Sequence, residues 1–136
     1  MKRKYYILSA AIALSSIALS SCGVDIDKSI NKMLIEANKQ CPVRIDSDTR
    51  LDKLINPGKG ILEYSYTLVN ITEDALAIDK DYVVSIHKNE IIKNLKNTGS
   101  KELKNIQQLN VTFRYTYHDK NGALLFSFDI TPEDYK

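Results

Sequence analysis

Two segments of the chain repeat their apolar residues at the spacing of an α-helix. Between residues 27 and 40 the apolar positions recur every three or four residues and form one face: Ile30, Met33, Leu34 and Ala37. We therefore predict a helix here, with Asp25 or Asp27 as its N-terminal cap. A second stripe of the same kind predicts a helix that begins at Asp79 or Asp81 and runs to about residue 97.

Four further segments are predicted as β-strands, and the last three of them alternate along the chain with the period of two that is typical of strands. These segments cover residues 51–55, 61–70, 111–118 and 124–130. Turn sequences separate them in pairs, with Pro57 and Gly58 in the first turn and an Asn-Gly dipeptide at 121–122 in the second. Residues 101–108 fit one more helical turn or a loop.

The order of these elements is helix, strand, strand, helix, strand, strand. This order predicts an α+β two-layer sandwich, in which a four-stranded antiparallel sheet carries two helices on one face. Two Tyr-x-Tyr strings, one with Tyr64 and Tyr66 and one with Tyr115 and Tyr117, share the core-facing side of the predicted sheet. They fit either aromatic core packing or a groove whose hydroxyl groups face a ligand.

The N-terminus has the features of a secretory leader. Three basic residues at 2–4 precede an apolar stretch at 7–19, which is too short to span a bilayer core of about 30 Å. The tetrapeptide Leu-Ser-Ser-Cys at 19–22 then resembles the lipobox of bacterial lipoproteins. The alternative interpretation is an ordinary signal peptide that is cleaved nearby, with a cysteine present by chance.

The lipobox resemblance implies how the protein is held in the cell. In that family the lipobox cysteine receives a diacylglyceryl group on its thiol and becomes the first residue of the mature protein. Carried over here, residues 1–21 are a removed signal peptide and Cys22 is the lipidation site. Residues 22–27 are then a lipidated tether, and 28–136 are a single α+β domain. Several acyl chains, palmitate among them, give stable attachment to a membrane of the cell envelope.

The residue after the lipobox cysteine bears on which membrane holds the protein. That residue is Gly23 rather than an aspartate. By resemblance to the sorting rules of enteric bacteria, this favours the outer membrane if the cell is Gram-negative.

Composition and charge narrow the class of protein further. Apolar residues make up 43% of the chain and charged residues 26%, as in ordinary globular domains. The formal charge of +2 becomes −1 once the three basic residues of the leader are removed, so bulk charge does not support nucleic-acid binding. The sequence has no phosphate loop, zinc pattern or nucleophile elbow, and lone histidines such as His87 and His118 are typical of structural or solvated positions. We therefore predict no enzyme activity, no cofactor and no metal.

The second cysteine has no partner within the chain if Cys22 carries lipid. In an oxidising compartment Cys41 is then buried, paired with another chain or chemically reactive.

A second resemblance comes from three short strings of the mature chain. They are a Cys-Pro start at 41–42, a Thr-Arg-Leu-Asp string at 49–52 and a Tyr-x-Tyr-Thr strand at 64–67. Together they resemble a group of small exported bacterial proteins with no established activity. The resemblance implies a shared fold and no mechanism.

Charged residues gather between the first predicted helix and the first predicted strand: Asp46, Asp48, Arg50 and Asp52. They form either a partner-binding loop or a structural turn, because aspartate side chains in turns accept hydrogen bonds from nearby backbone N–H groups.

These features predict a membrane-anchored lipoprotein of the cell envelope with a non-enzymatic binding or accessory role. Its partners are then the membrane, through the acyl chains on Cys22, and another envelope protein, with no nucleic acid. The alternative is an inhibitor or immunity-type lipoprotein that acts on an envelope enzyme or toxin.

Overall fold

The computed structural model describes residues 25–72 and 80–136, apart from the side chain of Glu102. The predicted signal peptide, the predicted lipidation site Cys22 and Asp79, a predicted start of the second helix, lie outside these residues. None of the described helices is long and apolar enough to cross a membrane.

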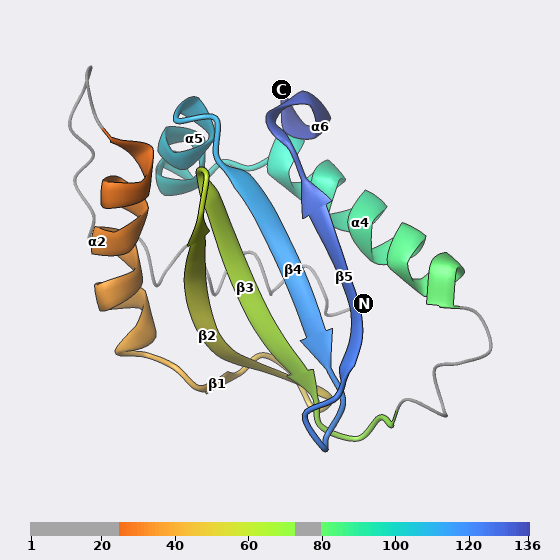
Figure 1. Cartoon of the computed structure of the whole chain (residues 1–136). Helices are drawn as coiled ribbons and strands as arrows, with labels where there is room; N and C mark the ends of the chain where they lie inside the picture. Colours follow the sequence, from red (N-terminus) through yellow and green to blue (C-terminus); the bar gives the residue numbers. More distant parts are fainter. Residues whose placement is uncertain (1–24, 73–79) are drawn as a thin grey trace.

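The chain forms helices and strands in the following order (Figure 1): α2 (Ile26–Asn38), β1 (Val43–Arg44), β2 (Thr49–Gly58), β3 (Ile61–Leu68), α4 (Lys80–Lys96), α5 (Lys101–Gln108), β4 (Thr112–His118), β5 (Leu124–Ile130) and α6 (Pro132–Tyr135). Helix α2 begins inside the predicted tether, because the Asp25 carboxylate caps it by accepting hydrogen bonds from the backbone N–H groups of Asp27 (3.0 Å) and Lys28 (3.3 Å). The ambiguous segment 101–108 is a helix of its own, capped by Ser100.

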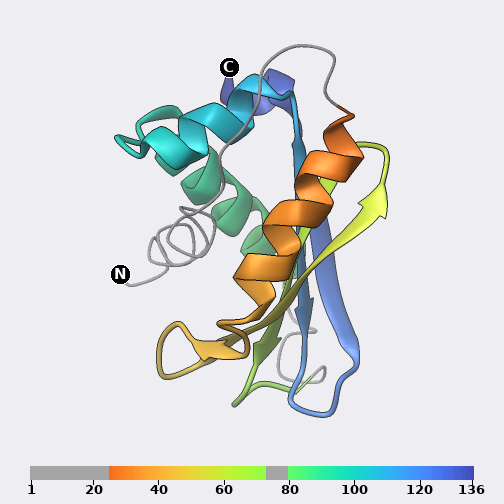
Figure 2. The same cartoon turned by 90° about the vertical axis from the view of Figure 1, so that its left-hand side faces the viewer.

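The α+β class is confirmed, but the sheet is not a four-stranded antiparallel one. It has five strands in the order β1-β2-β3-β4-β5, and β3 and β4 run parallel while the other neighbours are antiparallel. The prediction of two helices was also wrong, since the described residues contain α2, α4, α5 and α6. Figure 2 shows α2, α4 and α5 on the same side of the sheet, and no helix of the described residues on its other side.

The parallel pairing follows from the long connection between β3 and β4. Parallel strands need a crossover that returns the chain to the end of the sheet where the first strand began, and helices usually make that crossover. Here α4 and α5 make the return, so β4 starts beside the start of β3, with Ile61 opposite Thr112. An antiparallel pair would need only a short turn.

The Tyr-x-Tyr strings meet in the core because of this register. Tyr64 stacks on Tyr115 with ring centroids 5.0 Å apart, and Tyr66 stacks on Tyr117 at 4.9 Å. All four side chains are at most 1% exposed, so they pack in the core and do not line a groove. Stacked aromatic pairs of this kind add about 0.5–1.5 kcal/mol each beyond the area that they bury.

Helix α2 closes one edge of the sheet by side-chain hydrogen bonds. The Asn38 side-chain amide donates to the backbone oxygen of Leu54 at 2.9 Å, and its side-chain oxygen accepts from the Leu54 N–H at 2.8 Å. At the β2–β3 turn, the Asp27 carboxylate accepts from the Gly60 N–H at 2.8 Å, where Gly60 has a φ of 70°. The amide of Asn38 thus replaces a neighbouring strand beside β2.

Candidate functional site: the open face of the sheet

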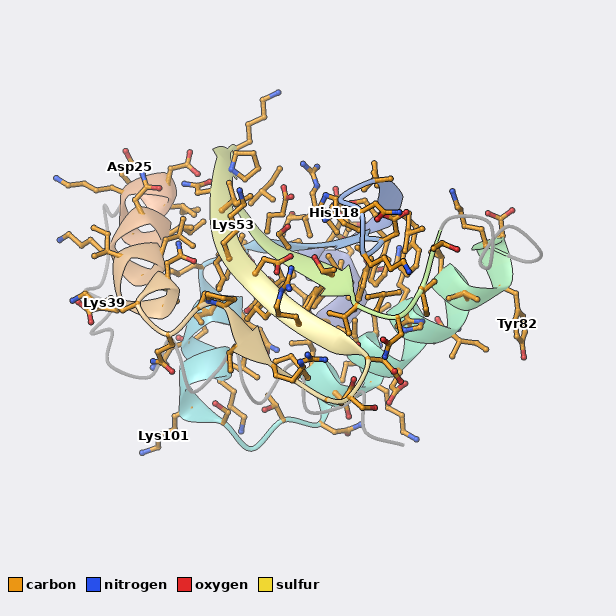
Figure 3. All side chains as sticks on the ribbon, turned by 90° about the horizontal axis from the view of Figure 1, so that it is seen from below. Asp25, Lys39, Lys53, Tyr82, Lys101 and His118 are labelled. Atoms are coloured by element: carbon orange, nitrogen blue, oxygen red, sulfur yellow. The ribbon has the colours of Figure 1, made fainter. Side chains whose placement is uncertain are left out.

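The face of the sheet that carries no helix is polar. Side chains alternate along each strand, so the residues between the buried aromatics point to this open face. The outward positions of three neighbouring strands carry Glu63, Ser65 and Thr67 on β3, Arg114, Thr116 and His118 on β4, and Ser127 and Asp129 on β5. Figure 3 shows Lys53 and His118 on the sheet layer and Lys101 and Tyr82 on the helix layer.

An ion pair joins β4 and β5 on the open face. Arg114 and Asp129 are directly opposite in the register, and the guanidinium donates from Nε to Oδ1 at 2.7 Å and from Nη2 to Oδ2 at 3.0 Å. The hydrogen bond to Asp129 is the main cause that raises the pKa of Arg114, and the neighbouring Glu63 carboxylate contributes. The next outward pair, Thr116 and Ser127, has its hydroxyl oxygens 3.0 Å apart.

A second polar cluster lies on β2 and β3. The strand pairing shifts register between Leu51 and Lys53, and Asp52 lies at that irregularity. The Asp52 carboxylate accepts from Arg50 Nε and from the Thr67 hydroxyl, each at 2.5 Å. The Arg50 side chain is 44% exposed, so solvent screens this pair and it contributes about 0–1 kcal/mol to stability.

The four charged residues predicted as one loop are therefore divided in the structure. Asp46 and Asp48 belong to the turn between β1 and β2, where the Asp46 carboxylate accepts from the Asp48 N–H at 2.8 Å. The Asn70 side-chain amide donates to the Asp48 carboxylate at 3.0 Å and connects this turn to the end of β3. Arg50 and Asp52 lie along β2, in the cluster with Thr67.

A shallow depression of about 720 Å³ extends over the open face toward the outer strand β5, and we call it the edge depression. Its lining comes from β3, β4, β5, the residue after β5, and α4: Glu63, Arg114, Thr116, Leu124, Ser127, Phe128, Asp129, Thr131 and Lys88. Two positive and two negative side chains line it, so its net charge is zero. An open, neutral surface with hydroxyl groups and one exposed leucine is suited to contact with another protein.

A ring nitrogen of each histidine lies within hydrogen-bonding distance of a backbone carbonyl oxygen. His87 is buried beside Tyr117 and Phe126, with Nδ1 at 2.8 Å from the Val83 oxygen. His118 Nδ1 lies 3.2 Å from the backbone oxygen of Tyr66. Among the described residues, no group of three His, Cys, Asp or Glu side chains could hold a metal ion.

Cys41 is half-buried next to α2. Its thiol lies 3.7 Å from the Ala37 backbone oxygen, as a weak hydrogen-bond donor, and it is a free cysteine in the described part of the chain. Burial is the main cause that raises the pKa of Cys41, and the Asp52 carboxylate adds to the shift. The thiol therefore stays protonated and weakly nucleophilic at neutral pH.

The edge depression was not predicted from the sequence. The alternation that predicts β4 and β5, together with the Asn-Gly turn, places Arg114 opposite Asp129, so this pair was accessible to sequence reasoning. The position of Glu63 beside Arg114 depends on the parallel pairing, and that of Lys88 depends on the packing of α4. No local sequence pattern predicts either of these two contacts.

Comparison with known proteins identifies the family. The family model described as "Domain of unknown function (DUF8479)" matches residues 25–126, so the chain belongs to this family. No curated protein matches the sequence significantly.

Solved structures share the fold at low sequence identity. A protein of Pseudomonas aeruginosa described as "a putative secreted protein" has a TM-score of 0.64 and 12% identity, over 88% of this chain and 100% of that one. The pilotin EpsS of the Vibrio vulnificus type 2 secretion system has a TM-score of 0.60 and 11% identity, over 82% of this chain and 92% of that one. The type II secretion system pilotin AspS of Vibrio cholerae has a TM-score of 0.55 and 11% identity, over 80% and 91%. At these identities the likeness is one of fold.

Proposed function

We propose that this protein is a lipid-anchored accessory protein of the bacterial cell envelope that binds another envelope protein and does not catalyse a reaction. The observation that carries the proposal is the open sheet face, where Arg114 is paired with Asp129 and the edge depression is shallow and neutral. Charged groups that are already paired are suited to positioning a partner and poorly suited to acid–base catalysis. The fold shared with two pilotins of type II secretion systems supports the same role.

The proposed anchor is the thiol of Cys22, which the lipobox resemblance marks. Three residue steps separate Cys22 from Asp25, the cap of α2, and an extended chain spans about 10 Å over that length. The N-terminal end of α2 would therefore lie at the membrane surface. Because the sheet extends away from that end of the molecule (Figure 1), the open face would extend from the bilayer and stay accessible to a partner. We propose the outer membrane as the site of attachment, on the identity of Gly23.

Purification of the membrane-anchored protein from its own cells, after mild crosslinking, tests the binding role. We expect one envelope protein to be retained at a one-to-one ratio. After solubilisation in detergent, the same protein should be retained by the Cys22→Ser variant, since the domain and not the lipid makes the contact. A parent protein that retains no stoichiometric partner would contradict the proposal.

The identity of the retained protein separates the accessory role from the inhibitor or immunity-type role. If the partner is an enzyme or toxin whose activity is lost in the one-to-one complex, the protein is an inhibitor. A structural or transport component supports the accessory role.

A further inference from the structure

The outer strand β5 is an open edge of the sheet. It spans seven residues, and β4 is its one strand neighbour in the part of the chain that the structure describes. Within residues 25–72 and 80–136, the backbone hydrogen bonds of turns, loops and caps do not reach it, and no side chain bonds to its backbone. In an edge strand, alternate N–H and C=O groups point away from the sheet and are available to another chain.

The opposite edge of the sheet, at β2, is closed. There β1 pairs with the first part of β2, and the Asn38 side chain binds both backbone polar groups of Leu54. Proteins commonly protect exposed edges with short strands, charges or covering segments. One edge is protected in that way, whereas at the other edge no segment of the described residues pairs with the seven-residue strand β5.

The surface beside β5 has the properties of a strand-binding surface. Leu124, at the start of the strand, is 57% exposed. The edge depression follows the strand through Ser127 and Asp129, and it is bounded by Lys88 on α4. Asp129 is paired with Arg114, and the two positive and two negative side chains of the lining balance, so the surface as a whole does not favour a segment of either charge.

We propose that the β5 edge accepts an extended segment of the envelope-protein partner as a sixth strand. This inference rests on the proposed function and names the site and the form of the bound segment. Backbone hydrogen bonds to β5 would supply the affinity, and side chains over the edge depression would supply the specificity. The neutral lining fits an uncharged segment that alternates apolar and small polar residues, with an apolar side chain on Leu124.

A second copy of this chain is a less suitable occupant. If two β5 strands paired around a two-fold axis at Ser127, the continuous sheet would place the helix layers of both copies on the same side. Lys88 lines the same depression as Ser127, so both ammonium groups would approach the axis and repel each other.

Two lysine substitutions and one matched control test the proposal on the complex purified from cells. Leu124→Lys and Ser127→Lys each place a charge on β5, and we expect each to lower the retained partner by about tenfold or more, because an added strand would bury an unpaired ammonium group. Ile35→Lys makes the same change at a side chain that is 63% exposed on α2, and it should retain the partner at the parent level. The changed side chains are solvent-exposed, and unchanged urea midpoints would establish that the variants fold.

Hydrogen exchange on the parent protein gives a second test that needs no variant. In the complex, the backbone amides of β5 should exchange at least about tenfold more slowly than in the isolated protein. If both β5 variants retain the partner at the parent level, the edge is not the site, although the binding role stands. If the parent retains no partner, both proposals fail. Concentration-dependent protection of β5 in the isolated protein would assign the edge to a second copy and overturn the inference.

Discussion

Replacing Asn38 by alanine tests whether a single side chain closes one edge of the sheet. The change removes the two hydrogen bonds to Leu54, at 2.9 and 2.8 Å, and leaves both backbone groups of this buried residue without a partner. Each such bond contributes about 0.5–1.5 kcal/mol net, so the loss is about 1–3 kcal/mol. Alanine is a better helix former than asparagine by roughly 0.5 kcal/mol, which offsets part of this loss. We expect Asn38→Ala to lower the free energy of unfolding by about 1.5 kcal/mol.

The matched control is Asn89→Ala, in the middle of α4. Asn89 is exposed, and its side chain makes no hydrogen bond within residues 25–72 and 80–136. Asn89→Ala therefore has only the gain in helix propensity and should be stabilised by roughly 0.5 kcal/mol. The difference between the variants, about 2 kcal/mol, measures the two bonds of Asn38.

Urea unfolding of residues 22–136 carrying Cys22→Ser is the assay, because the core residues that the structure describes lie within residues 30–135. With a slope of about 1.5 kcal/mol per molar urea, Asn38→Ala should lower the midpoint by about 1 M. Equal midpoints for Asn38→Ala and Asn89→Ala would refute the argument that the amide replaces a strand.

Further predictions concern the anchor, a thiol, a buried phenol and an ion pair. Cys22→Ser should abolish metabolic labelling by a fatty-acid analogue, and equal labelling of variant and parent would contradict the proposed lipidation. The raised pKa of the half-buried Cys41 should make its thiol react slowly with maleimide at neutral pH until urea is added; rapid native labelling would show an accessible thiolate. Burial raises the pKa of Tyr135 to about 12 from the ordinary value near 10, so the folded state holds its proton longer and stability should fall as the pH rises from about 10 to 12. Tyr135→Phe should lessen that fall. At neutral pH the variant should be less stable by about 1 kcal/mol, because it loses the 2.8 Å hydrogen bond to the Val111 oxygen. Urea midpoints measured at neutral pH and across this range test both effects. Arg50→Ala should cost at most about 1 kcal/mol because the side chain is exposed, and a larger loss would mean that the pair is shielded from solvent.

Local sequence determined where the longer elements form, among them α2, β3, β4 and β5, and which face each of these buries. The stripe of α2 buries Ile30, Met33 and Ala37 as its spacing predicts. In β4 the alternation sends Tyr115 and Tyr117 into the core, and the outward residues between them follow from the same period of two. These properties depend on backbone geometry over a few residues, so they can be inferred from neighbours in the chain.

The tertiary structure alone decided the direction of β4 and the partners of the strands. The sequence between β3 and β4 does not by itself show at which end of the sheet β4 begins. The parallel pairing of β3 with β4 followed from where α4 and α5 pack. The packing of α4 brought Lys88 to the edge depression, and the packing of α2 brought Asn38 to the edge at Leu54. Among the residues that the structure describes, β5 has no strand on its outer side. Contacts between residues far apart in the chain depend on how all the elements pack together, and no short segment contains that information.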